Sequence, residues 1–290
     1  MSLDVLVAGL LAGGLYALVG LGLTLVFGVL RLMNLAHGEL IVGGAFLASL
    51  LVQHFSLDPL AALPFAMLAV GAVAYLTQRL LLTGLLRRSA TAPLVATFGL
   101  SLIAQAGLQA GFGPDYRSLN ASYAYSGFTV LGVRVQTIYA ISFAVGVALT
   151  LATHLILTRT RAGSAVRAAA ADPTTAALLG IDVARVYALT VAGAAALAAA
   201  AGVLTGVAQS FSPTSGQPLL LVGFAVMALG GTRGAGGVLA GGLALGLAQS
   251  IAVSLFGGGY RNAVVYIAFL LVIAFRPANV RVPRLRGAPA

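Results

Sequence analysis

The sequence has no cysteine and no lysine, and it has few charged residues of any kind. Without cysteine, the chain can form no disulfide, no cysteine-based metal site and no thiol chemistry. Without lysine, it cannot form a Walker A phosphate loop, so it does not bind ATP in that way. Charged residues make up 8% of the chain, whereas a soluble domain has about 25%. Because so little polar surface is available, the lipid bilayer must be the solvent of most of the chain.

Long apolar runs fill most of the 290 residues, of which 60% are hydrophobic. The runs fall at about 5–29, 35–52, 60–82, 92–112, 135–158, 186–208, 219–232, 236–256 and 260–276. A membrane-spanning helix needs roughly 20 residues. The run at 219–232 is short and could be a broken or re-entrant helix buried in protein. We therefore predict an all-α polytopic membrane protein with eight to ten transmembrane or re-entrant helices, forming one domain over residues 1–282.

The 16 arginines alternate between the connections that join these runs. Thirteen lie in every second connection or after the last run, and three lie in the others: Arg117, Arg134 and Arg261. Because arginine accumulates in cytoplasmic loops, this pattern predicts a periplasmic amino terminus and a cytoplasmic carboxyl terminus. It also explains the net charge of +10 without any nucleic acid. The last residues, 283–290, are expected to form a basic disordered tail.

The segment 159–185 is the longest stretch that is typical of a folded piece outside the lipid, with four arginines and two acids. Asp172 followed by Pro173 is a helix start, because Asp accepts hydrogen bonds from free N–H groups and Pro suits the first helical position. The string Leu178-Leu179-Gly180 predicts a helix end, with the glycine in the left-handed conformation. A short helix pair on the basic side of a membrane protein indicates a contact with another molecule.

Glycines recur at a four-residue spacing in three pairs: Gly9 and Gly13, Gly237 and Gly241, and Gly242 and Gly246. In lipid, such spacing lets helix backbones approach closely. The strings 5–15 and 238–247 are also alike, and the predicted topology runs them in opposite directions, which suggests an inverted repeat of the transporter type.

Polar residues within the apolar runs are the candidates for a translocation pathway, because such groups are costly in lipid. The densest group is Asn34, His37 and Glu39, which could line the path or support a gate. Glu39 could instead be an interfacial cap that faces helix N–H groups or Arg31. The uncharged candidates either line a pore or bond neighbouring helices; they are Ser101, Gln105, Gln109 and Gln249.

No group of residues indicates catalysis or a metal site, and no acid is clearly placed in the middle of a run, although Glu39 comes nearest. A proton-coupled transporter would need such acids. The energy for transport must therefore come from another molecule, or the chain is a passive channel.

Several strings resemble the permeases of branched-chain amino-acid ABC transporters of the LivH type. The most specific is Asn34-Leu-Ala-His-Gly-Glu39, which follows Gly28-Val-Leu-Arg-Leu-Met. Thr97-Phe-Gly-Leu-Ser-Leu102 is similar to the family's fourth-span motif. Residues 167–181 resemble its cytoplasmic coupling loop, although Ala171 stands where a Glu is common and Pro173 follows the Asp. In order and spacing, the matches extend from about residue 5 to 282.

This resemblance implies a multi-pass permease of the cell inner membrane that has no cofactor of its own. It implies three kinds of partner: a second permease of the LivM type or a copy of this chain, two ATP-binding subunits that use ATP in the cytosol, and a periplasmic substrate-binding protein. It also implies that the coupling loop docks on the ATPase through Arg167, Asp172, Pro173, Leu178, Leu179 and Gly180.

The implied substrates are branched-chain or other hydrophobic, neutral amino acids, but similar permeases carry urea and short amides. Two further readings stay open from the residues alone. One is an ion-coupled secondary transporter, and the other is a passive channel for a small neutral solute. Only the importer explains 159–185 as a docking element.

Overall fold

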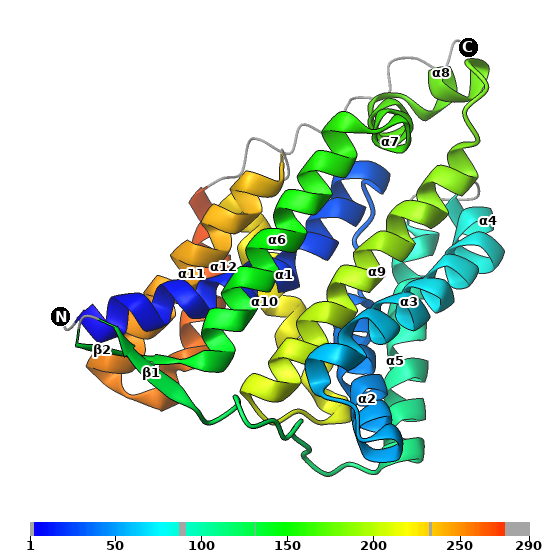
Figure 1. Ribbon diagram of the computed structural model, residues 1–290. Helices are drawn as coiled ribbons and strands as arrows, with labels where there is room; N and C mark the ends of the chain where they lie inside the picture. Colours follow the sequence, from blue (N-terminus) through cyan, green and yellow to red (C-terminus); the bar gives the residue numbers. More distant parts are fainter. Residues whose placement is uncertain (1–2, 87–90, 131, 232–233, 276–290) are drawn as a thin grey trace.

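The computed structural model describes residues 3–86, 91–130, 132–231 and 234–275, and it is mostly helical (Figure 1). The long helices are α1 (Leu3–Leu30), α2 (His37–Phe55), α3 (Pro59–Thr77), α5 (Ala92–Phe112), α6 (Thr137–Arg159), α9 (Val183–Ala208), α10 (Gly216–Gly230), α11 (Ala235–Phe256) and α12 (Arg261–Phe275). Shorter elements are a π-helical turn at Gln78–Leu82, α4 (Thr83–Leu86), α7 (Arg161–Ala171), α8 (Pro173–Leu178), and 3-10 turns at Pro213–Ser215 and Gly258–Tyr260.

Among the described residues, eight helical segments are long and apolar enough to cross a membrane, and α12 is a shorter apolar helix. This number agrees with the predicted eight to ten segments, and the chain is a multi-pass membrane protein. The helical segment that contains the short run at 219–232 begins before residue 219. A 3-10 turn at Pro213–Ser215 leads directly into α10, and together they span 18 residues.

One local feature departs from the expected all-helical fold. Strand β1 (Gly127–Val130) pairs antiparallel with β2 (Val133–Gln136), with Phe128 opposite Val135. In β2, Val133 and Val135 are buried while Arg134 and Gln136 are exposed, which is the two-residue alternation of a strand. The apolar run predicted from residue 135 therefore begins inside this hairpin, and helix α6 starts at Thr137.

Helices α1 and α11 pack closely along two of the predicted glycine pairs. A Cβ on Gly9 would lie 2.9 Å from the Ser250 Cβ, and one on Gly13 would lie 2.7 Å from the Leu243 Cα. A Cβ on Gly242 would come within 2.5 Å of the Ala17 backbone. Early residues of α1 thus contact late residues of α11, so the two helices are antiparallel, as predicted. The pair Gly237 and Gly241 packs in the same way on the end of α10 at Gly230.

Helix α9 lies at the centre of the bundle, and its small residues make room for α2 and α3. Ala198 to Ala201 are fully buried. Gly44 of α2 has no space for a Cβ beside Ala199, and Gly202 has none beside the Ile41 carbonyl. In lipid, where apolar surface alone does not drive helices together, such close backbone packing holds the bundle together.

The two ends of the bundle differ. Helices α7 and α8 lie at one end, and the β-hairpin lies at the other (Figure 1). Arg87, Arg88 and Arg233, which entered the charge pattern, lie outside the described residues. So do Arg276, Arg281, Arg284 and Arg286 and the whole expected tail at 283–290. The orientation of the termini therefore stays a prediction from the sequence.

Candidate functional site

The predicted polar residues at the start of α2, Asn34, His37 and Glu39, are all buried in the interior. Helix α1 ends at Leu30, and Arg31 adopts a left-handed conformation with a φ of 55°. The chain then turns back, and the Asn34 side-chain oxygen accepts a hydrogen bond from the Ala36 N–H at 3.1 Å. The Asn34 carbonyl accepts from the His37 N–H at 3.3 Å. Asn34 therefore shapes the turn that precedes α2, and its side chain is buried.

Glu39 lies one turn further on, between α5 and the start of α10. Ser101 of α5 donates its hydroxyl to one carboxylate oxygen at 3.4 Å. Within the described residues, the other oxygen is buried without a hydrogen-bond partner. A Cβ on Gly216, the first residue of α10, would overlap this carboxylate. The sequence suggested two structural partners for Glu39: the N–H groups of a helix start, or Arg31. Glu39 faces a helix start, and it makes no ion pair with Arg31 in the described chain.

His37 occupies the point where α1, α2 and α9 meet. Its side chain is fully buried. A Cβ on Gly22 of α1 would lie 2.8 Å from the His37 ring and 2.5 Å from the Ala194 carbonyl oxygen of α9. Glycine at position 22 is therefore what allows the imidazole to sit between these helices.

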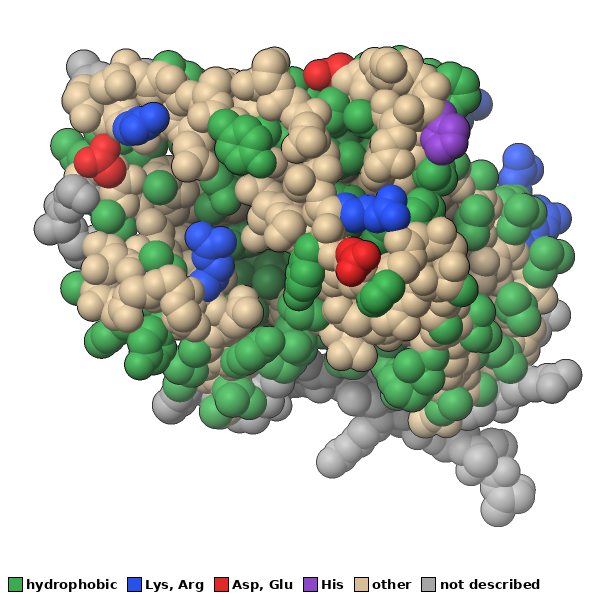
Figure 2. All heavy atoms as spheres, turned by 90° about the horizontal axis from the view of Figure 1, so that it is seen from below, with side chains coloured by type: hydrophobic (Ala, Val, Ile, Leu, Met, Phe, Trp, Pro, Cys, Tyr) green, Lys and Arg blue, Asp and Glu red, His purple; other side chains and the backbone are tan. Residues whose placement is uncertain are grey.

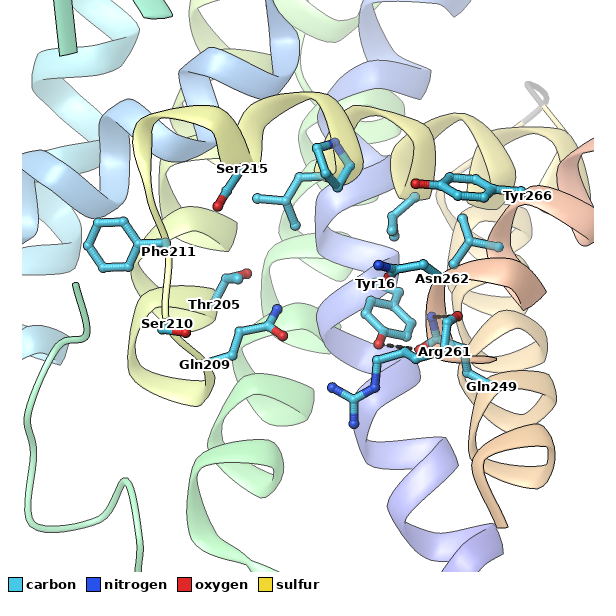
Figure 3. A pocket seen from close by; sticks show the side chains of 14 residues that line it. Tyr16, Thr205, Gln209, Ser210, Phe211, Ser215, Gln249, Arg261, Asn262 and Tyr266 are labelled. Atoms are coloured by element: carbon cyan, nitrogen blue, oxygen red, sulfur yellow. Dashed lines mark hydrogen bonds between the residues drawn. The ribbon is translucent and has the colours of Figure 1, made fainter. Parts of the chain in front are cut away.

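Gln249 belongs to a second polar group, at the hairpin end. The Tyr16 hydroxyl of α1 donates to the Gln249 side-chain oxygen, and the Gln249 amide donates to the Arg261 carbonyl at 2.9 Å. This chain of hydrogen bonds ties α1, α11 and the start of α12 together (Figure 3). The same three residues line two half-open cavities, of about 160 and 320 Å³.

The smaller cavity has a polar part and an apolar part. Its polar lining is Tyr16, Thr205, Gln209, Ser210, Ser215, Gln249, Arg261 and Asn262, and its apolar lining is Phe211, Pro218, Leu219, Val222 and Val265, with Tyr266 adding an aromatic ring. Figure 3 shows α10 crossing α1 beside this space. Seen from the end that is at the bottom of Figure 1, the surface is hollowed near its middle, where basic and apolar side chains border the depression (Figure 2). The arrangement suits a small molecule that has both a polar and an apolar part.

The seven pathway residues predicted from the sequence thus fall into three sets. Asn34, His37, Glu39 and Ser101 are all buried near the start of α2, where Glu39 and Ser101 bond each other, and Gln249 lies at the two cavities. Gln105 is half-buried and Gln109 is exposed on α5, and neither lines these cavities.

Tyr16, Thr205 and Arg261 were not among the predicted pathway residues, although each lines the smaller cavity. The sequence held one signal for this site. The connections that alternate with the arginine-rich ones carry only three arginines, and Arg261 is one of these.

The helix pair α7–α8 is built by local capping, as predicted. Thr160 accepts from the Gly163 N–H at 3.0 Å and starts α7. Asp172 accepts from the Thr174 N–H at 2.9 Å and from the Thr175 hydroxyl, and Pro173 is the first residue of α8. The hydrogen bond from the Thr175 side chain is the main reason that the pKa of Asp172 lies below its usual value. The carboxylate therefore stays ionised and caps α8 at neutral pH.

Helix α8 ends as the sequence predicts. Gly180 has a φ of +83°. The N–H groups of Gly180 and Ile181 bond the carbonyls of Ala177 and Ala176, which closes the helix in a Schellman motif. The Leu178 and Leu179 side chains are 84% and 76% exposed. Arg167 of α7 is also exposed and donates to the Ser164 hydroxyl at 3.2 Å. The pair thus presents two adjacent leucines on a rigid support.

Comparison with known proteins shows that this sequence is similar to those of transport permeases. A family model described as the permease component of the branched-chain amino acid transport system matches residues 5–274. The high-affinity branched-chain amino acid transport system permease protein BraD of Pseudomonas aeruginosa is 30% identical, over 96% of this chain and 95% of its own length. LivH of Escherichia coli is 28% identical, over 94% and 92%. A probable LivH of Methanocaldococcus jannaschii is 28% identical, over 93% and 88%.

Proposed function

Because the chain belongs to the family of branched-chain amino acid transport permease components, we propose that it is the permease subunit of an importer driven by separate ATP-binding subunits. It carries branched-chain or other hydrophobic, neutral amino acids across the cell inner membrane. The chain supplies the path, and the partner subunits bind and hydrolyse ATP, because a chain without lysine cannot form a Walker A loop.

The exposed Leu178–Leu179 pair carries this proposal. Both side chains lie at the end of a capped six-residue helix, next to the apolar spans but not part of one. Adjacent large apolar side chains that stay exposed on an ordered element are typical of a protein-binding surface. In the proposed importer, an ATP-binding subunit covers these leucines, and its closure on ATP moves α7 and α8.

The movement has a direct route into the bundle. Helix α7 follows α6 after a single residue, Thr160, and a Cβ on Gly163 would overlap the Ile156 carbonyl of α6. Ala169 of α7 and Ala176 of α8 are buried against the bundle. Because packed helices shift as units rather than deform continuously, a displacement of α7 is expected to rock α6 and α9.

The arginine pattern orients this importer, with α7 and α8 in the cytosol and the hairpin in the periplasm. A periplasmic binding protein would then deliver the substrate to the hairpin end, where the smaller cavity beside Tyr16 and Gln249 opens. A second permease, of the LivM type or a copy of this chain, would complete the path.

One observation favours a second candidate function. Glu39 is a buried acid with one unpartnered oxygen in the described chain, and intramembrane acids often serve ion or proton coupling. An ion-coupled secondary transporter would use Glu39 but would leave the exposed leucines of α8 without a role.

The test is capture of the partner. The chain is co-expressed with the ATP-binding subunits encoded by its neighbouring genes and purified through a tag on the permease. We expect a complex that holds the ATPase through size-exclusion chromatography in detergent. A folded permease that retains no ATPase under these conditions would contradict the proposal.

A further inference from the structure

The smaller cavity at the hairpin end holds a positive charge that nothing in the described chain neutralises. Arg261 lines it, and neither this cavity nor the larger one beside it has an Asp or Glu among its described lining residues. The Arg261 guanidinium also makes no hydrogen bond or ion pair in the described part of the chain. The Arg117 guanidinium, at the same end, is engaged instead: it donates to the Phe112 carbonyl and lies over the rings of Phe46 and Phe112.

The backbone that carries Arg261 is held in place. The Gln249 amide bonds the Arg261 carbonyl, and the Tyr16 hydroxyl holds the Gln249 amide from the other side. Arg261 is also the first residue of α12. Its position therefore depends on three helices, while its side chain is left free and extends into the open space (Figure 3).

A second polar group faces the same cavity from α9. Thr205 is only 3% exposed, and its hydroxyl has no hydrogen-bond partner among the described residues. A buried hydroxyl without a partner is costly, and a ligand in the adjoining cavity that bonded it would remove that cost. Figure 3 shows the Thr205 hydroxyl directed toward the space that Gln209 and Arg261 border.

The remaining wall is apolar and is formed in part by Leu219, Val222 and Val265. The cavity of about 160 Å³ is similar in size to one of about 150 Å³ that holds benzene in another protein. It can therefore take a short aliphatic side chain next to its polar part.

We propose that this cavity is a subsite for an aliphatic amino acid with a free carboxylate, in which Arg261 binds the carboxylate and the Thr205 hydroxyl bonds the same polar head. Guanidinium matches a carboxylate with two parallel hydrogen bonds. A neutral solute such as urea or a short amide would offer the arginine no opposite charge to bind. The inference rests on the proposed function and narrows it, because it separates the amino-acid substrate from the amide alternative.

The test compares leucine with leucinamide, which keeps the ammonium group and lacks the carboxylate. Uptake of labelled leucine is measured in proteoliposomes that contain the permease, its ATPase partners, its second permease and its binding protein. The competing concentration of each unlabelled compound is varied. For the wild type, we expect leucine to compete far better than leucinamide.

Arg261→Gln should raise the KM for leucine by about tenfold or more, which corresponds to the loss of one charge-assisted hydrogen bond, with little change in kcat. Arg261→Lys should keep part of the affinity, and Thr205→Val should cause a smaller rise in KM. Arg134→Gln is the matched control, because Arg134 lines only the larger cavity, and its KM for leucine should stay as in the wild type.

An unchanged KM for leucine in a folded Arg261→Gln complex would overturn the subsite. An equal rise in Arg134→Gln would overturn it as well, because the effect would then be one of general charge. Absence of ATP-dependent uptake by the wild type would contradict the proposed function, and this result is separate from the other two. Binding of leucine to the detergent-purified wild-type and Arg261→Gln complexes, measured by calorimetry, would still test the subsite in that case.

Discussion

The carboxylate of Glu39 lies directly against Gly216, so that the starts of α2 and α10 meet inside the protein. Two chain segments that are 177 positions apart are joined at this point. The contact requires glycine at position 216, because any larger residue would push the carboxylate away. It also places a carboxyl group at the positive end of the α10 dipole.

The first prediction follows from this contact. Gly216→Ala should destabilise the protein by about 1–3 kcal/mol, the usual range for overpacking in a tight interior. Gly43→Ala, on the same helix as Glu39, has open space around it and should be neutral. Thermal unfolding of the two variants in detergent measures the difference. Equal unfolding temperatures would show that the close approach of α2 and α10 is not present.

The second prediction concerns the glycines between α1 and α11. Gly242→Val should prevent accumulation of folded protein, because its side chain would overlap the Ala17 backbone. Gly236→Ala, in the same helix, adds a methyl group where no atom lies within 4 Å, and its yield should match that of the wild type. Monodisperse protein recovered by size-exclusion chromatography is the readout. Normal recovery of Gly242→Val would disprove this helix pairing.

The third prediction tests the surface of α8. Replacement of Leu178 and Leu179 by Asp should abolish co-purification of the ATPase while leaving the spans folded, because both side chains are exposed and contribute little to the bundle. Tyr125→Asp is the control, since Tyr125 is 84% exposed and lies two residues before β1, not in α8. If the double variant retained the ATPase as well as the control does, α8 would not be the docking element.

The fourth prediction concerns the cap of α8. Asp172→Ala should weaken ATPase capture, less than the leucine replacements do, because the helix loses its cap. Asp172→Asn should keep it, since Asn also caps. The pKa of Asp172 is lowered in the folded chain. Its contribution is therefore complete above the unfolded-state pKa of about 3.9 and is lost only as the pH falls through the lower, folded-state value.

Docking in the wild type should accordingly not change between pH 5 and 8 as far as Asp172 is concerned. Hydrogen exchange of residues 173–182 follows the cap directly. Fast exchange in Asp172→Asn, equal to that in Asp172→Ala, would contradict the capping role.

The parts of the molecule that the sequence predicted well are those that depend on local chemistry. The cap at Asp172, the proline after it and the left-handed Gly180 are all set by residues a few positions apart, so the α7–α8 pair follows from the order of residues alone. The spacing of Gly9 and Gly13 likewise indicated a close helix contact, and the predicted topology gave its antiparallel direction.

The parts that were missed depend on contacts between distant segments. Nothing near Glu39 in the sequence indicates that Gly216 lies against it. Tyr16 and Gln249 are 233 positions apart, so their bond and the cavity beside it appear only in the fold. The hairpin was missed because Val133 and Val135 continue an apolar run that leads into a helix, and a two-residue alternation over four residues is easily hidden by such a run.

The measurement that tests the central claim most directly is uptake of leucine into proteoliposomes loaded with ATP or with a non-hydrolysable analogue. The account predicts accumulation only when ATP, the ATP-binding subunits and the binding protein are all present, and none when Leu178 and Leu179 are replaced by Asp. Uptake by the permease alone, either as accumulation driven by an ion gradient or as passive equilibration, would contradict it.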